Sequence, residues 1–188
     1  MVTIKDLSPI ALEKLETFSK SLINIEDESE EKMNQISLAY RVRMEPLFEK
    51  RHQTLSTVEG FWSGVFSSHE TALHTFMNST IDPKIIRTII DFKVVSTVKD
   101  NKLIRKVCLV LRGSIFADGG TISREIDTDT NTLSIQPIHW KEGTDRARKD
   151  SLFRFFEENT KVDMEFLSDA LEAFDNVFQN PFLAVEKD

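Results

Sequence analysis

Two histidines, His69 and His74, stand in the stretch HETALH, where imidazole side chains could bind a metal ion. A helical zinc site of the metalloprotease kind places its histidines at positions i and i+4, on one face of the helix. Here the spacing is five residues, which on a helix would turn the two imidazoles about 140° apart. The stretch therefore does not predict a zinc site.

Other residue types that carry chemistry also lack the partners that the chemistry needs. Cys108 has no CxxC partner, which excludes a zinc cluster built on thiolates. Asp127 and Asp129 lie in a turn, as in a calcium loop, but the glycine and the terminal glutamate of such a loop are missing. Glu157 and Glu158 are neighbouring carboxylates, and a solvated face explains them better than an acid–base pair, because nothing indicates a pocket around them. We therefore predict no enzymatic activity, no metal and no cofactor.

The acidic residues are concentrated toward the C-terminal end, and the formal net charge is −7. Residues 1–149 contain 21 acidic and 21 basic side chains, whereas residues 150–188 contain 10 acidic and three basic ones. Such a surface attracts cationic partners and repels phosphate backbones, so we expect no direct binding of nucleic acid. A charge of this size also serves ordinary solubility, which stays open as the alternative. No apolar stretch approaches 18 residues, so we expect no membrane span.

Residues 8–45 predict one long helix. Ser8-Pro9 supplies an N-cap and a proline for the first turn, and no Gly or Pro interrupts residues 10–45. Apolar residues recur every three or four positions, with a weaker stretch across the acidic run at 26–31. Pro46 is expected to kink or end the helix, because proline lacks the N–H that the next turn requires.

A helix of roughly 57 Å is longer than a domain built from the rest of the chain, so its apolar stripe needs a partner. The simplest partner is a second copy of the same helix, and we predict a homodimer. The predicted interface consists of Leu15, Phe18, Leu22, Ile25, Met33, Ile36 and Tyr40. The alternative is two shorter helices, broken at the acidic run and folded into a monomeric bundle.

The remaining residues predict an α+β arrangement. Residues 56–77 indicate a helix, and Asp82-Pro83 indicates a break before a helical turn at 85–90. Four short, sequential, β-branched segments predict an antiparallel sheet, at residues 92–98, 103–111, 121–126 and 133–138. Residues 164–178 predict a last helix with an apolar side and an opposite acidic side.

Four stretches resemble, in order, the signature segments of the nucleosome assembly protein (NAP/SET) family. They are PLFEKR at 46–51, GFW at 60–62 with SH at 68–69, IHWKEG at 138–143 with SLFRFF at 151–156, and DNVFQNP at 175–181. One departure is Asn176, which stands where the family motif has a second acidic residue.

The resemblance implies a long dimerisation helix, paired antiparallel with its copy, followed by an α/β "earmuff" domain with a four-stranded antiparallel sheet packed with helices. We place these parts at residues 1–52 and 53–188. It also implies a histone chaperone that binds core histones on an acidic concave surface and promotes nucleosome assembly or histone removal. The expected location is the nucleus, with exchange into the cytoplasm left open.

The predicted histone contacts are six carboxylates. Only Asp175 is carried over from the family motif, whereas the other five follow from helical geometry and charge. The six are Glu157, Glu158, Glu165, Asp169, Glu172 and Asp175. The alternative function is a dimeric scaffold or regulatory subunit for a chromatin-modifying enzyme, binding a non-histone partner. Salt-sensitive binding favours the chaperone and salt-insensitive, apolar binding favours the scaffold.

Overall fold

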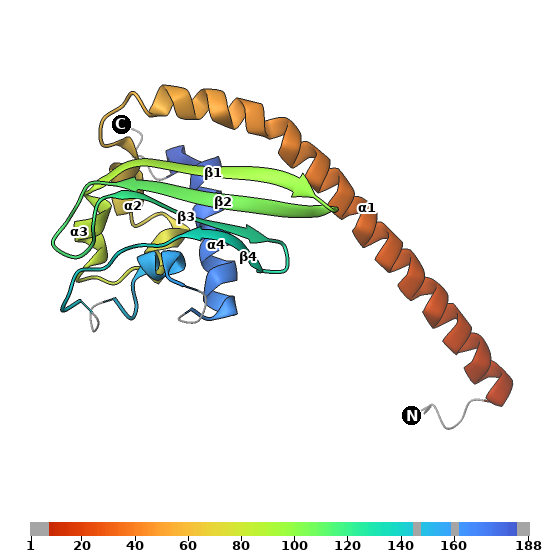
Figure 1. The fold of residues 1–188 in the computed structure, drawn as a ribbon. Coiled ribbons are helices and arrows are strands. Elements are labelled where there is room, and N and C mark those ends of the chain that lie inside the picture. Colours follow the sequence, from red (N-terminus) through yellow and green to blue (C-terminus); the bar gives the residue numbers. More distant parts are fainter. Residues whose placement is uncertain (1–7, 145–147, 159–161, 184–188) are drawn as a thin grey trace. The chain divides into compact units, whose positions relative to one another are not determined.

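The computed structural model describes residues 8–144, 148–158 and 162–183 (Figure 1). The chain divides into two compact units between residues 41 and 42. The predicted domain boundary at residue 52 lies within the first helix and remains a prediction, and the outermost residues of both predicted domains, 1–7 and 184–188, lie outside the described ranges. No helix in the described part of the chain is long and apolar enough to cross a bilayer.

One uninterrupted helix, α1 (Pro9–Leu55), forms the N-terminal element. Ser8 caps it as predicted, because its Oγ accepts a hydrogen bond from the N–H of Ala11 at 3.3 Å. The alternative of two shorter helices is wrong, since α1 passes through the acidic run. Within that run Glu28 and Lys32 form an ion pair one turn apart, which supports the helix.

Of the two expected effects of Pro46, a kink or an end of the helix, the second is wrong, because α1 continues to Leu55. Proline removes one backbone hydrogen bond, so the turns beyond it need support from elsewhere. Phe48 packs its ring edge-on against Phe178 with 5.9 Å between centroids. Arg51 donates a hydrogen bond to the backbone carbonyl of Phe178. These tertiary contacts, which the local sequence does not reveal, hold the last turns of α1 in helical form.

Four antiparallel strands form one sheet in the order β1-β2-β3-β4, which confirms the predicted sheet. They are β1 (Ile89–Lys99), β2 (Lys102–Leu111), β3 (Gly120–Asp127) and β4 (Thr132–Gln136). Asp100 and Asn101 join β1 to β2 with φ angles of 51° and 62°, and two such residues are what a tight hairpin requires. Ile89 and Ile90 belong to β1 and not to the predicted helical turn, because Ile89 pairs with Leu111 of β2.

The helix predicted over residues 56–77 is divided into two short elements. These are α2 (Phe61–Ser67) and the 3-10 helix η2 (Ala72–Phe76). Gly60 precedes α2 with a φ of 75°, a left-handed conformation that glycine adopts without strain and that separates α2 from α1. Ser68 ends α2 in an extended conformation. The predicted break at Asp82-Pro83 becomes the start of α3 (Asp82–Ile86).

The helix α4 (Met164–Gln179) packs across one face of the sheet and closes the core (Figure 1). Asp163 caps it, accepting a hydrogen bond from the N–H of Phe166 at 2.7 Å. Its apolar side reaches β1, where the rings of Phe174 and Phe178 lie 6.0 and 5.8 Å from that of Phe92. The predicted C-terminal helix is thus confirmed.

A further 3-10 helix, η3 (Leu152–Phe156), contains three phenylalanines whose buried rings complete the core. The ring of Phe155 lies 5.0 Å from that of Phe174, so η3 and α4 share one aromatic interior. A final short turn, η5 (Pro181–Leu183), follows α4.

Candidate functional site

The six carboxylates predicted to contact histones lie on two segments, the end of η3 and the helix α4. Four of them are exposed, namely Glu158, Glu165, Asp169 and Glu172. Glu157 and Asp175 are buried, with 9% and 4% of their surface exposed. Four of the six carboxylates are therefore exposed, and the other two are largely buried. Their role as histone contacts stays a prediction.

Asp175 is buried because an arginine of the sheet faces it. Arg105 of β2 places Nη1 3.4 Å from Asp175 Oδ2 and 2.8 Å from Glu172 Oε2. Gln179 Nε2 also donates to Asp175 Oδ2 at 3.0 Å. This corrects the placement of Asp175 on the exposed acidic side of the last helix. Its carboxylate ties α4 to the sheet, and Glu172 extends the same ion pair to the surface.

Arg105 was missed in the sequence, although a signal for it was present. It lies two and four residues before Val107 and Leu109, which are fully buried core residues of β2. Side chains two apart on a strand point to the same face, so Arg105 had to face the core side. A charged group there needs an opposite charge, and the last helix carries the nearest acidic residues.

A second inward arginine, Arg124 of β3, fixes the backbone at Glu157. Arg124 is fully buried and donates to the carbonyl of Glu157 and, at 2.8 Å, to the hydroxyl of Thr132. Its guanidinium also lies 5.7 Å from the ring centroid of Phe155. Burial lowers the pKa of Arg124 to about 10, which keeps it charged at neutral pH. Arg124 thus anchors the end of η3 to β3 and β4.

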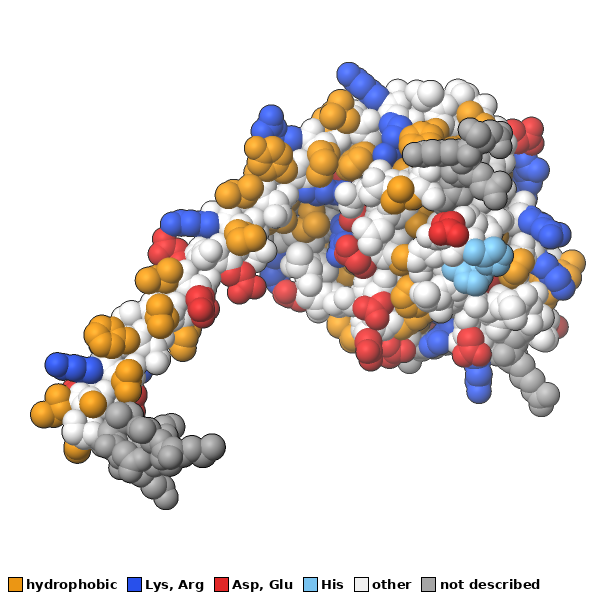
Figure 2. All heavy atoms as spheres, turned by 180° about the vertical axis from the view of Figure 1, so that it is seen from behind, with side chains coloured by type: hydrophobic (Ala, Val, Ile, Leu, Met, Phe, Trp, Pro, Cys, Tyr) orange, Lys and Arg blue, Asp and Glu red, His pale blue; other side chains and the backbone are white. Residues whose placement is uncertain are grey.

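The seven side chains predicted to form the dimer interface are all exposed. Their exposed fractions run from 49% for Leu15 to 66% for Met33. At 100° per residue the seven fall within an arc of about 80° on α1. Figure 2 shows hydrophobic side chains at the surface along this helix. Among described residues 8–41, which form one helix and its cap, nothing covers this stripe, and its role in a dimer stays a prediction.

The two histidines lie closer together than a continuous helix would allow. The chain turns after His69 and η2 begins only at Ala72, which brings His69 Nδ1 to 2.7 Å from His74 Nε2. Both rings are exposed, and histidine side chains are visible at the surface in Figure 2. The expected 140° separation is therefore wrong. Within the described ranges no three His, Cys, Asp or Glu side chains are placed to hold a metal ion.

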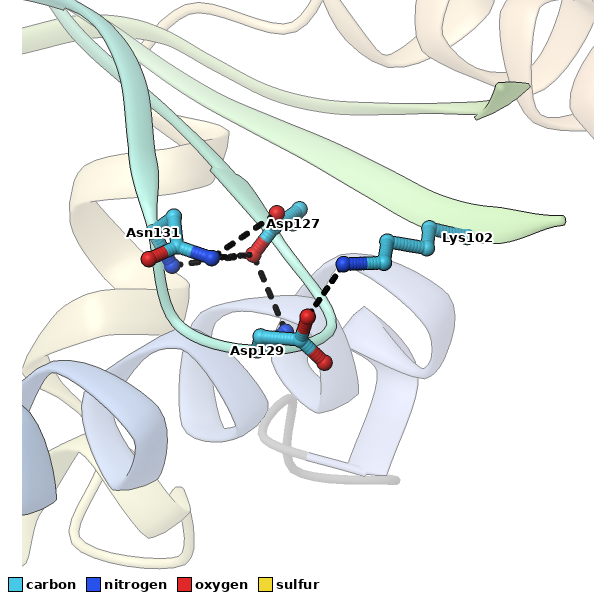
Figure 3. Close-up of polar contacts among 4 residues, drawn as sticks. All are labelled: Lys102, Asp127, Asp129 and Asn131. Atoms are coloured by element: carbon cyan, nitrogen blue, oxygen red, sulfur yellow. Dashed lines mark hydrogen bonds and ion pairs between the residues drawn. The ribbon is translucent and has the colours of Figure 1, made fainter. Parts of the chain in front are cut away.

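The turn that suggested a calcium loop uses its first carboxylate to hold its own backbone (Figure 3). Asp127 Oδ1 accepts hydrogen bonds from the N–H groups of Asp129 and Asn131, both at 2.9 Å. The Asn131 side chain donates to both oxygens of Asp127, and this hydrogen bond is the main cause that lowers the pKa of Asp127. Asp129 pairs with Lys102 of β2. The acidic residues of this turn are thus engaged in closing the β3–β4 hairpin.

Sequence comparisons point to plant relatives of one family, although no protein-family model matches the chain. Over 137 residues, 71% of its length, the chain is 25% identical to NAP1-related protein 2 of Arabidopsis thaliana. It is 24% identical, over the same length, to NAP1-related protein 1 of that plant. The chain spans about half the length of these curated relatives, 52% in each case.

Solved structures share the fold over nearly the whole chain. Nucleosome assembly protein S from Plasmodium falciparum matches with a TM-score of 0.60 and 17% identity, over 91% of this chain and 97% of that one. Ccp1 matches with a TM-score of 0.59 and 18% identity, over 93% and 98%. Nucleosome Assembly Protein 1 from Plasmodium knowlesi matches with 0.58 and 13%, over 99% and 100%. The chain therefore has the fold of the nucleosome assembly proteins, and its resemblance to that family is confirmed.

Proposed function

We propose that this protein is a histone chaperone that acts in the nucleus as a homodimer and holds core histones on an acidic surface. The observation that carries the proposal is the row of exposed carboxylates along α4, formed by Glu165, Asp169 and Glu172. At 100° per residue these three lie within an arc of about 60°, away from the buried aromatic side of α4, and Glu172 at the edge of the row also pairs with Arg105 of β2. The names of its relatives and the fold support the same interpretation.

The row can act without any chemical step. Histones are strongly cationic, and a rigid line of carboxylates competes for them with the phosphates of DNA. Because α4 is capped and packed on the sheet, the backbone that carries these carboxylates is fixed before a partner arrives, which lowers the ordering cost of binding. Exposed charge pairs are individually weak and screened by salt, so binding should fall as salt rises.

The dimer is proposed to form through the apolar stripe of α1. Its large side chains are placed symmetrically about Ser29, with Ile25 and Met33 four residues away on either side. Two further pairs lie seven and eleven residues from Ser29, namely Leu22 with Ile36 and Phe18 with Tyr40. An antiparallel copy related by a two-fold axis at Ser29 would set the members of each pair side by side. Each buried side chain contributes about 1.5–3 kcal/mol.

The test is light scattering on a sizing column, with the protein and purified core histones at low and at high salt. The wild-type protein should elute as a dimer that carries histones at low salt and releases them at high salt. The triple variant E165Q/D169N/E172Q should bind histones at least about tenfold more weakly. The matched control E13Q/E16Q/E30Q removes the same charge from exposed positions of α1 and should bind as the wild type does.

A dimer that ignores histones at every salt concentration would contradict the chaperone proposal. Retention of a non-histone partner at high salt would favour the alternative, a scaffold or regulatory subunit for a chromatin-modifying enzyme. Equal loss in the two triple variants would mean that net charge, and not the row on α4, governs binding.

A further inference from the structure

A cavity of about 250 Å³ lies between the segment that follows β4 and the end of η3. Residues 137–140 form one side of it and Glu157 and Glu158 form the other, with Arg148 also in the lining. Two of the six predicted histone contacts thus face a hollow that the row on α4 does not include. A hollow can select one side chain, whereas a row of exposed carboxylates responds mainly to charge.

The walls of this cavity are fixed by backbone contacts. The N–H of Ile138 donates to the carbonyl of Phe156 at 3.0 Å, which joins the two sides. The carbonyl of Glu157 is held by the buried Arg124. Trp140 forms an isolated bridge with Ala117, which holds the far end of the segment. The cavity is therefore present before a ligand binds and does not have to be assembled.

The lining combines two carboxylates with an indole ring. Glu157 has only 10% of its side chain exposed, and Arg148 Nε lies 4.0 Å from Glu157 Oε1, beyond hydrogen-bond distance. Among the lining residues that the structure describes, the two carboxylates of Glu157 and Glu158 outnumber the single arginine. Trp140 is half-buried and lines the cavity, and an indole ring is a group on which a flat cation can stack.

We propose that this cavity binds a single arginine side chain of a cationic polypeptide, an inference that rests on the proposed histone-chaperone function and names one contact within it. A guanidinium is planar, so it can stack on Trp140 while its N–H groups donate to Glu157 and Glu158. Lysine offers a point charge without a flat face and gains less from the indole. Arg148 is the internal competitor, since it already pairs with Glu157 and a guest guanidinium replaces that contact.

The experiment follows the two indole N–H resonances of the ¹⁵N-labelled full chain, which contains two tryptophans. Trp62 is 2% exposed in the core and serves as the internal reference. The probes are nine-residue Gly/Ser peptides with one central arginine, lysine or citrulline, titrated at low salt. The variant W140F assigns the Trp140 resonance.

The arginine peptide should shift the Trp140 resonance and leave that of Trp62 in place, with a several-fold weaker effect for lysine and none for citrulline. The double variant E157Q/E158Q should lose the shift, while R148A should bind the arginine peptide about two- to threefold more tightly. The control E142Q removes a nearby exposed charge outside the cavity and should behave as the wild type. An unmoved Trp62 resonance in each variant verifies the fold.

The absence of a Trp140 shift with any peptide would overturn the proposal, as would a shift that survives in E157Q/E158Q. Weaker binding in R148A together with stronger binding in E157Q/E158Q would also overturn it, because the guest would then be an anion. If no peptide shifts the Trp140 resonance while core histones still bind, only the proposal of an arginine site in the cavity is wrong. If the arginine peptide binds while core histones do not, the cavity stands and the chaperone proposal fails.

Discussion

The amphipathic helices α4 and α1 differ in whether their apolar sides are buried within the chain. On α4 the apolar side is buried, and Phe174 at its centre has no exposed surface. On residues 9–41 of α1 the apolar stripe is exposed, and Phe18 keeps 63% of its surface. The apolar side of α4 is therefore covered by its own chain, whereas the stripe of α1 is not covered by the described residues of this chain.

The apolar side of α4 contributes to folding, whereas the apolar stripe of α1 would contribute to assembly. The burial of α4 is an intramolecular event, so its contribution does not depend on protein concentration. The burial of the α1 stripe in a dimer would be intermolecular and would follow mass action. Mutations in the two helices should therefore be distinguishable by whether their effects change with concentration.

The largest effect is expected from charged residues in the α1 stripe. The double variant F18E/L22E should raise the dimer dissociation constant by more than about 1000-fold, since each chain loses two large apolar contacts and would bury two charges. Light scattering at several concentrations measures it. The control K20E/N24E places two glutamates on the opposite side of the same helix and should leave the dimer intact. If F18E/L22E remains dimeric, the helix pairs through another surface.

Truncation of the core side of α4 should act on folding alone. Phe174 contacts the rings of Phe92, Phe155 and Phe156, so F174A should lower the free energy of unfolding by about 3–5 kcal/mol. Urea unfolding of the F18E/L22E background, where no dimer is expected, isolates this loss from assembly. If F174A alone, without F18E/L22E, lost more stability on dilution, α4 would take part in the dimer contact.

A pH-dependent contribution to the free energy of unfolding is expected from Asp82, at the start of α3. Burial raises its pKa to about 6, even though Ser151, Leu152 and Asn78 donate hydrogen bonds to it. Because the folded pKa lies above that of the unfolded chain, this group stabilises the fold fully below about pH 4, and the contribution is lost as pH rises through 6. The total is at most about 3 kcal/mol.

The measurement is urea unfolding between pH 4 and pH 7.5, for the wild-type protein and for D82N. The difference in unfolding free energy between the two should change with pH, because only the wild type has a titrating group at this position. A constant difference over the whole range would show that the hydrogen bonds to Asp82 keep its pKa near the ordinary value.

Much of the fold could be predicted because its signals are local. The cap at Ser8 and the four β-branched segments of the sheet each depend on a few neighbouring residues. The stripe of α1 could also be predicted, since helical periodicity does not require knowledge of what lies opposite. The resemblance to the nucleosome assembly proteins placed these pieces in order.

The errors arose where distant residues decide the outcome. The helix continues beyond Pro46 because Phe48 and Arg51 find contacts on α4, far away in sequence. The two histidines meet because the chain turns before η2, which a helical pattern over 56–77 concealed. Asp175 was assigned to the surface because helical geometry alone does not show that Arg105 lies opposite it on the sheet. For Pro46 and Asp175 a tertiary partner overrode a local preference, whereas for the histidines a turn of the chain interrupted the helical pattern.

The smallest effects are expected within α4, where Asp175 lies on the buried side and Asp169 on the exposed side. D175N should lower the free energy of unfolding in urea by about 1–3 kcal/mol. The reason is that it weakens the ion pair with Arg105, whose side chain is only 16% exposed. D169N should change stability by no more than about 0.5 kcal/mol but weaken histone binding about two- to threefold at low salt. If D175N instead reduced histone binding at unchanged stability, Asp175 would act as a histone contact, as the family motif implied, and the Arg105 ion pair would be of little structural consequence.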